Sequence, residues 1–113
     1  MDEKRSFKRI NYREPVLYRL LFDQPDIGCV GYDISAGGIR CTVNDFIPLG
    51  KEIQLTVHLT RDDLVALTGR VVWVKRLAHG ENYQVGLRFV ETNGIDPIKE
   101  RLADYIEASK SFS

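Results

Sequence analysis

Alternation of apolar and polar residues with a period of two runs through most of the chain, and it limits the fold more than any other feature. This alternation, or a longer apolar run, occupies residues 16–22, 26–34, 37–43, 53–59, 64–74 and 83–89. A period of two places alternate side chains on opposite faces of a β-strand. Turn-forming residues such as Gly37-Gly38 and Pro48-Leu49-Gly50 separate the runs. The sequence therefore predicts about six short strands, with a bulge or bend at Gly69 in the longest one.

Only the C-terminal segment changes its period. Its apolar residues recur at intervals of three and four, as on one face of a helix: Ile95, Ile98, Leu102, Tyr105 and Ile106. Asp96 followed by Pro97 is typical of a helix N-cap and a first helical residue. We predict an all-β fold in which six antiparallel strands close into a barrel over residues 14–91, since closure leaves no strand edge unpaired. A helix over residues 95–110 is expected to pack on this barrel.

The length and composition fit a single compact domain over residues 1–113. The chain is 43% hydrophobic, and its 16 basic and 16 acidic residues give a formal net charge of zero. A neutral total argues against a general nucleic-acid coat protein and a binder of acidic membranes, which carry a net positive field. Two cysteines, Cys29 and Cys41, are too few for a disulfide scaffold, and no signal peptide or membrane-spanning apolar stretch is present. We expect a cytoplasmic protein without membrane insertion, with both thiols reduced in the core.

The usual catalytic and metal-binding patterns are missing from the sequence. His58 and His79 have no second histidine or cysteine at a metal-ligand spacing. Asp62 and Asp63 are neighbours in a turn, where carboxylates more often close the turn than share a proton. No GxSxG, P-loop or GxGxxG motif occurs. We therefore expect no enzymatic activity, no catalytic residues, no metal and no cofactor.

The first 13 residues carry a local excess of positive charge, with five basic and two acidic side chains. Arg5 and Arg9 are four residues apart, so one helical turn or a folded-over arm could aim both guanidinium groups in the same direction. Each guanidinium is a planar fork that takes phosphate oxygens, or the O6 and N7 edge of guanine, through two parallel hydrogen bonds. Because it has few apolar anchors, the segment 1–13 is expected to be a flexible basic arm. The alternative interpretation is a solvated tail without a ligand.

A second candidate cluster follows at residues 33–38, which read Asp-Ile-Ser-Ala-Gly-Gly. Asp33 and Ser35 are two residues apart at the end of a strand, so they project from the same side. The carboxylate can accept the N–H donors of a guanine Watson–Crick edge, and the hydroxyl adds a polar contact. Gly37 and Gly38 allow positive φ and the close approach of a ligand or another backbone. The alternative interpretation is a serine turn that closes the hairpin.

Together, RxxxR as Arg5-Ser-Phe-Lys-Arg9 and DxSxxG as Asp33-Ile-Ser-Ala-Gly-Gly38 resemble the two-part motif of the PilZ domain family. Leu49-Gly50 before a strand, Gly69-Arg-Val-Val-Trp73 and Tyr83-Gln-Val-Gly-Leu-Arg-Phe89 also read like positions of this family. The resemblance implies a six-stranded Greek-key barrel with a C-terminal helix.

The resemblance further implies that the protein binds cyclic di-GMP, a bacterial second messenger. Arginines of the first motif would hold phosphates and guanine, the acid and hydroxyl of the second would bond guanine edges, and its last glycine would keep the surface open. The implied ligand-binding residues are Arg5, Arg9, Asp33, Ser35 and Gly38. Additional candidate contacts are Lys4, Gly37 and Trp73. Arg40 and Arg88 are auxiliary candidates, although a solvated charge on a strand face is the preferred interpretation of each.

On this interpretation the protein is a bacterial receptor that binds cyclic di-GMP and signals to an unidentified partner protein, in motility, adhesion and biofilm formation, or exopolysaccharide control. Its oligomeric state could change with the ligand. Two alternatives stay open. One is a protein-interaction module that works without ligand. The other is a barrel that binds single-stranded nucleic acid, against which the neutral total charge argues.

Overall fold

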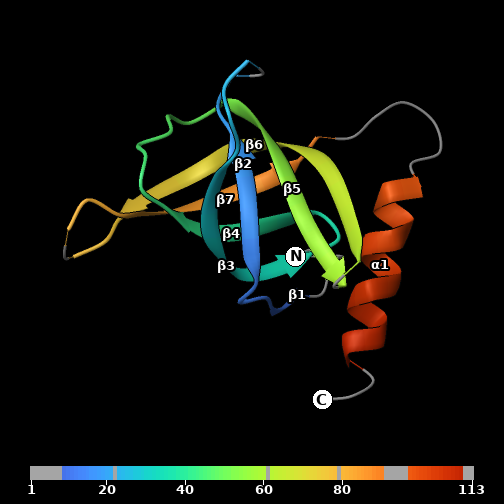
Figure 1. The fold of residues 1–113 in the computed structure, drawn as a ribbon. Coiled ribbons are helices and arrows are strands. Elements are labelled where there is room, and N and C mark those ends of the chain that lie inside the picture. Colours follow the sequence, from blue (N-terminus) through green and yellow to red (C-terminus); the bar gives the residue numbers. More distant parts are fainter. Residues whose placement is uncertain (1–8, 22, 61, 79, 91–96, 111–113) are drawn as a thin grey trace.

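The computed structural model describes residues 9–21, 23–60, 62–78, 80–90 and 97–110 (Figure 1). Within these ranges the chain forms antiparallel strands and one C-terminal helix, which confirms the predicted fold class. The elements are β1 (Arg9–Asn11), β2 (Pro15–Arg19), β3 (Ile27–Ser35), β4 (Gly38–Val43), β5 (Glu52–Thr60), β6 (Asp63–Arg76), β7 (Tyr83–Phe89) and α1 (Pro97–Lys110). Ile95 and the predicted N-cap Asp96 lie outside the described residues.

Six of the strands close into the barrel. They are hydrogen-bonded in the order β3-β2-β5-β6-β7-β4, and a further β3–β4 pairing joins the two ends of this series. The chain crosses from β4 to β5, which are not neighbours, whereas the other successive strands from β2 to β7 pair directly. This crossover gives the Greek-key connectivity that the family resemblance implies. Closure gives every barrel strand a hydrogen-bonded neighbour on each side, over part of its length.

The strand β1 lies within the segment that the sequence predicts to be an arm. Residues 1–8 of that segment are outside the described residues, but Arg9–Asn11 pair with the end of β3, from Arg9 opposite Ser35 to Asn11 opposite Asp33. The strand β2 pairs only with the first part of β3, as far as Val30. The last residues of β3 therefore offer an unpaired edge, which β1 occupies.

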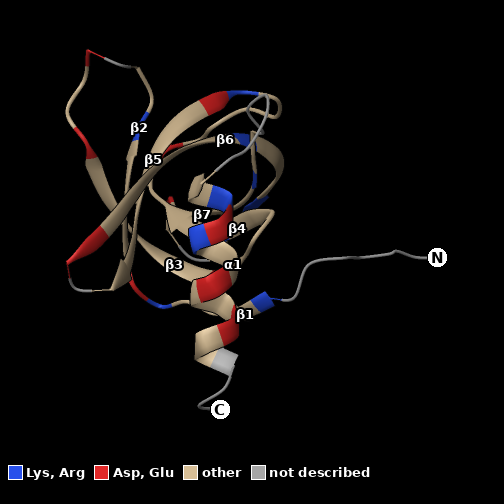
Figure 2. Ribbon diagram, turned by 90° about the vertical axis from the view of Figure 1, so that its right-hand side faces the viewer, with Lys and Arg blue, Asp and Glu red and all other residues tan. Residues whose placement is uncertain are grey.

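The inward faces of the strands form one apolar core, and α1 packs on its outside near β1 and β3. Burial of such side chains stabilises the fold by about 1.5–3 kcal/mol each. From the helix, Leu102 and Ile106 are buried, and Tyr105 meets Tyr12 edge to face with ring centroids 6.3 Å apart. Figure 2 shows residues of both charges along the rest of α1. No helix among the described residues is long and apolar enough to cross a membrane.

The bulge in the longest strand does not lie at Gly69, where the sequence predicts a bulge or a bend. Gly69 is regularly paired with both Ile53 and Phe89, and the register shift between β6 and β7 lies between Val71 and Trp73. A Cβ on Gly69 would lie 2.9 Å from the Leu55 Cδ1 atom. The glycine thus makes room for a core leucine, and the bulge falls at Val72 instead.

The two cysteines lie on neighbouring strands and both are free thiols. Cys41 in β4 is fully buried, whereas Cys29 in β3 is half-buried against the core. The register places Cys41 opposite Gly31, so the two thiols are offset by two residues rather than directly opposed. A hydrogen bond with the Cys29 thiol, together with burial, raises the pKa of Cys41.

Candidate functional site

A register shift in the β3–β4 hairpin creates the outer surface of the candidate site. The shift lies between Gly31 and Asp33. It resets the alternation of β3, so that Tyr32 and Asp33 both point away from the core while Ile34 points into it. Beyond the shift, Asp33 lies opposite Arg40 on β4.

Asp33 and Arg40 begin a row of facing residues that continues across two more strands. Arg40 lies opposite Gly86 on β7, and Gly86 lies opposite Trp73 on β6. A Cβ on Gly86 would fall only 2.3 Å from the Trp73 Nε1 atom, so the absence of a side chain lets the indole ring lie against the β7 backbone. An acid, a cation and an aromatic ring are therefore aligned on one face, although they come from distant parts of the sequence.

The Asp33 carboxylate is bonded to two arginines. Arg9 donates from Nη1 to Oδ1 at 2.8 Å, and Arg40 donates from Nε to both oxygens at 2.9 Å each. The Arg40 Nη2 group also donates to Oδ2. Burial alone would raise the pKa of Asp33, which is only 5% exposed, but the bonds from Arg40 and Arg9 outweigh it and hold the pKa below its usual range. The carboxylate is thus ionised and paired.

Ser35 and Gly38 form the tight turn that closes the hairpin. The Ser35 hydroxyl accepts from the backbone N–H groups of Gly37 and Gly38, both at 3.2 Å, and donates to the Gly38 carbonyl at 3.4 Å. A Cβ on Gly38 would lie 2.3 Å from the Leu87 carbonyl oxygen. Gly38 therefore permits the close approach of another backbone, as predicted, but it does so without a positive φ.

Two surface hollows meet over this row of residues. One is about 390 Å³ and is lined by Arg9, Arg40, Val72 and Trp73, among others. The second is about 260 Å³ and extends over the hairpin turn to Arg88. Both are lined by Arg9, Val72 and Leu87, so they form one continuous depression, which we call the cationic hollow.

Most of the described residues predicted as ligand contacts come together at the cationic hollow: Arg9, Ser35, Gly37, Gly38 and Trp73. Asp33 does not line it but is bonded to the two arginines that do, Arg9 and Arg40. Lys4 and Arg5 lie outside the described residues.

The sequence favours solvated charges on strand faces for Arg40 and Arg88, and the structure places both side chains at the hollow. Pairing about the Gly37-Gly38 turn could have placed Arg40 near Asp33. Arg88 lies opposite Gly38, a position that depends on the long-range β4–β7 pairing.

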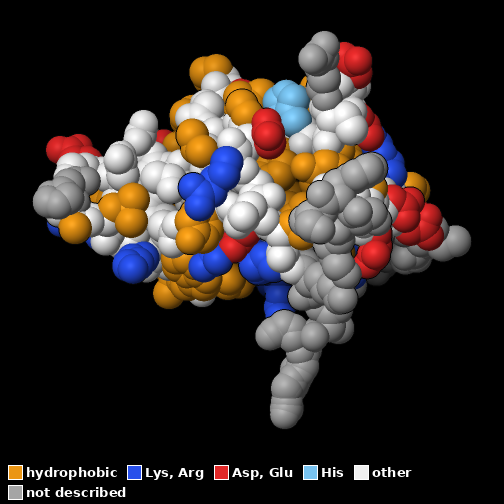
Figure 3. Space-filling view, turned by 90° about the horizontal axis from the view of Figure 1, so that it is seen from below, with side chains coloured by type: hydrophobic (Ala, Val, Ile, Leu, Met, Phe, Trp, Pro, Cys, Tyr) orange, Lys and Arg blue, Asp and Glu red, His pale blue; other side chains and the backbone are white. Residues whose placement is uncertain are grey.

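An exposed aromatic ring extends the basic character of this face. The guanidinium carbons of Arg13 and Arg40 lie 4.5 Å and 4.8 Å from the centre of the Tyr32 ring. Such contacts hold cations by the electron-rich face of the ring. Figure 3 views the side of the molecule that carries β1 and shows basic side chains next to exposed hydrophobic ones.

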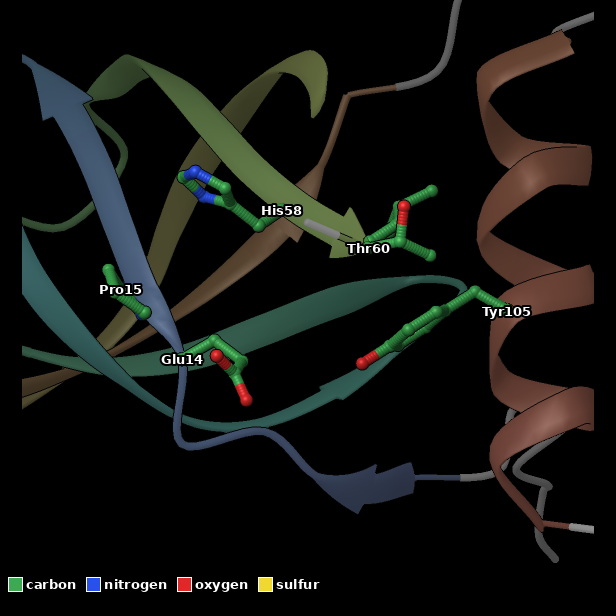
Figure 4. A pocket seen from close by; sticks show the side chains of 6 residues that line it. Glu14, Pro15, His58, Thr60 and Tyr105 are labelled. Atoms are coloured by element: carbon green, nitrogen blue, oxygen red, sulfur yellow. The ribbon is translucent and has the colours of Figure 1, made fainter. Parts of the chain in front are cut away.

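A separate hollow lies between the barrel and α1, and we call it the helix groove. It is about 530 Å³ and is lined by Glu14, His58, Thr60 and Tyr105, with Pro15 and Leu59. Figure 4 shows these side chains coming from the start of β2, the end of β5 and α1. The His58 Nδ1 atom is buried without a hydrogen-bond partner in the described structure. None of the predicted ligand residues lines the helix groove.

The sequence matches the PilZ domain over residues 3–108. Because this match covers most of the chain, the protein belongs to the PilZ domain family. No curated protein is a significant match to the sequence.

Solved structures with the same fold include the inhibitor of motility MotI/DgrA of Bacillus subtilis, 18% identical, with a TM-score of 0.81 over 99% of this chain and 54% of that chain. The PilZ domain of Escherichia coli YcgR, solved with c-di-GMP, is 18% identical with a TM-score of 0.69, over 95% of this chain and 91% of that one. The K. pneumonia MrkH–c-di-GMP complex is 17% identical with a TM-score of 0.65, over 99% of this chain and 57% of that one. The chain spans about half the length of MotI and of the longer YcgR structure.

Proposed function

We propose that the protein binds cyclic di-GMP in the cationic hollow. The observation that carries this proposal is the convergence of Arg9, Arg40 and Trp73 in one hollow, with both arginines bonded to the ionised Asp33. Membership of the PilZ family supports it, as do the YcgR and MrkH structures, which were solved with this ligand. Arg5 and Lys4 would add cations from the N-terminal segment, and Ser35, Gly37 and Gly38 would form the floor at the hairpin turn.

The chemistry of the hollow matches the parts of a cyclic dinucleotide. Its two phosphates are anions that arginine forks bind through charge-assisted hydrogen bonds. Its bases are flat rings that can stack on Trp73, at about 1–3 kcal/mol per base for such contacts. A guanine Watson–Crick edge presents N–H donors, and the Asp33 carboxylate is an acceptor of such donors.

The protein would act by binding rather than by catalysis, and the signal would pass to a partner protein. Occupation of the hollow would change the surface around β1 and the β3–β4 hairpin, and it could change the oligomeric state. Motility, adhesion or exopolysaccharide control are the processes expected for the partner, and the structurally similar MotI is an inhibitor of motility.

The single tryptophan of the chain offers a direct test, because Trp73 lines the hollow. Its fluorescence is followed during titrations with cyclic di-GMP, GTP and a short single-stranded DNA. We expect a saturable change with cyclic di-GMP alone, confirmed by calorimetry, with the nucleotide recovered unchanged. Binding of DNA that falls steeply with salt would support the nucleic-acid alternative instead. Absence of binding to any of the three would favour the ligand-independent interaction module.

A further inference from the structure

The Asp33 carboxylate has little acceptor capacity left for a ligand. An ionised carboxylate offers about four lone-pair sites. In this structure Arg40 contributes three donor contacts and Arg9 a fourth. The residue is also only 5% exposed. A base that is to bond with Asp33 must therefore displace an arginine.

The Arg40 side chain presents the same donor pattern as the base that would replace it. It approaches with the Nε–H and Nη2–H groups, two donors on one carbon. Guanine carries N1–H and the 2-amino group on its C2 carbon, which is also a guanidine unit with two parallel donors. The carboxylate can receive one such edge side-on, but not two at once.

We propose that Arg40 is a built-in competitor for guanine at Asp33, so that cyclic di-GMP binds by exchanging its guanine edge for the Arg40 guanidinium. This inference rests on the proposed function and describes how that same site is regulated. The apparent affinity is then the intrinsic affinity reduced by the fraction of molecules in which the Arg40–Asp33 pair is open. Arg40 would thereby set the messenger concentration at which the protein responds.

After displacement from Asp33, the Arg40 side chain can stay in contact with the Tyr32 ring. The Arg40 guanidinium already lies 4.8 Å from the centre of the exposed Tyr32 ring, and its side chain is 34% exposed at the edge of the hollow. Leaving Asp33 therefore does not require the cation to leave the site, where it can face a ligand phosphate. The ring already contacts Arg40 while Arg40 is bonded to Asp33, and the same cation–π contact would keep the guanidinium in the site after the exchange.

The exchange also selects between bases. Adenine lacks the pair of parallel donors, so displacing Arg40 with adenine would leave the buried Asp33 carboxylate with fewer hydrogen bonds. A site that holds buried polar groups rejects a ligand that cannot satisfy them. Guanine restores the bonds that Arg40 gives up.

The test uses Arg40→Lys, because lysine keeps the positive charge but has no planar fork. Calorimetric titrations with cyclic di-GMP and with cyclic di-AMP are made on the wild type, Arg40→Lys and Arg88→Lys. The control Arg88 lines the same hollow but is not among the residues bonded to Asp33. We expect Arg40→Lys to bind cyclic di-GMP about five- to tenfold more tightly, the gain when a competing state populated at about 80–90% is removed. Arg88→Lys is expected to show no gain, and cyclic di-AMP no response to either change.

A second variant acts in the opposite direction and guards against a folding defect in the first. In Tyr32→Leu the ring that would hold Arg40 after its bonds to Asp33 are lost is missing, so we expect this variant to bind cyclic di-GMP more weakly. If the wild type binds cyclic di-GMP and Arg40→Lys binds it equally well or more weakly, the exchange is overturned. The proposal that cyclic di-GMP is the ligand is then unaffected. An equal gain in Arg88→Lys would overturn it as well, since it would indicate general loosening. Absence of cyclic di-GMP binding in all proteins would overturn the proposed function, and the exchange with it.

Discussion

The cationic hollow and the helix groove differ in charge far more than in size. The helix groove is about 530 Å³, and the two parts of the cationic hollow are about 390 and 260 Å³. Three arginines line the cationic hollow, whereas among the described residues Glu14 is the one that lines the groove with a carboxylate or guanidinium side chain. A ligand with two phosphates would be attracted by the first and repelled by the second. Volume alone would not have distinguished these sites.

The largest expected effect separates the two regions directly. Arg9→Ala removes a cation that lines the cationic hollow and bonds to Asp33, so it should weaken cyclic di-GMP binding by about 2–5 kcal/mol. Glu14→Gln in the helix groove is the matched control and should leave the affinity unchanged, as measured by calorimetry. Equal losses in the two variants would contradict the assignment of the ligand to the cationic hollow.

At the floor of the cationic hollow, the backbone of Gly38 lies close to the Leu87 carbonyl on the neighbouring strand. Gly38→Ala would place a Cβ against the Leu87 carbonyl, so we expect the free energy of unfolding to fall by about 1–3 kcal/mol or more. Gly28→Ala is the control, because its Cβ would meet nothing closer than 4.0 Å. Denaturant unfolding of both variants gives the comparison. A Gly38→Ala protein as stable as Gly28→Ala would show that β4 and β7 are not held this closely.

The ionised Asp33 should make the stability of the cationic hollow sensitive to acid. Its pKa is lowered in the folded protein, so its contribution is present above the ordinary aspartate pKa of about 3.9 and is lost as the pH falls through the lowered value. We expect the difference in unfolding free energy between the wild type and Asp33→Asn to shrink over this acidic range. Urea unfolding at a series of pH values measures it. A difference that stays constant with pH would contradict the pairing of Asp33 with the arginines.

The smallest effect belongs to the helix side of the molecule. The Tyr12 hydroxyl donates to the His58 carbonyl at 2.5 Å, next to the helix groove. Tyr12→Phe removes this bond and should lower the free energy of unfolding by about 0.5–1.5 kcal/mol, because a buried acceptor loses its donor. Cyclic di-GMP affinity should stay the same in this variant. A tenfold loss of affinity would indicate that the two regions are coupled through β1.

Local patterns in the sequence were sufficient for the elements of the fold. The period of two located the six barrel strands, and the change to intervals of three and four located α1. The turn at Ser35 and Gly38 could also be read locally, since its hydrogen bonds join residues within three positions of one another. A bulge at Gly69 is not observed, because the register shift lies at Val72 instead. A glycine in a strand can also make room for a tightly packed neighbour, as Gly69 does for the Leu55 side chain.

The sequence by itself therefore determined the strands, the helix and the two short motifs, which depend on neighbours along the chain. Only the tertiary structure decided that Trp73 lies over Gly86, and that Trp73 and Arg40 meet Arg9 in one hollow. The physical reason is register. Barrel closure aligns the β3–β4 hairpin with β6 and β7, which are distant in the chain, through the β4–β7 pairing, and a shift of one residue in that pairing would turn these side chains to the opposite face.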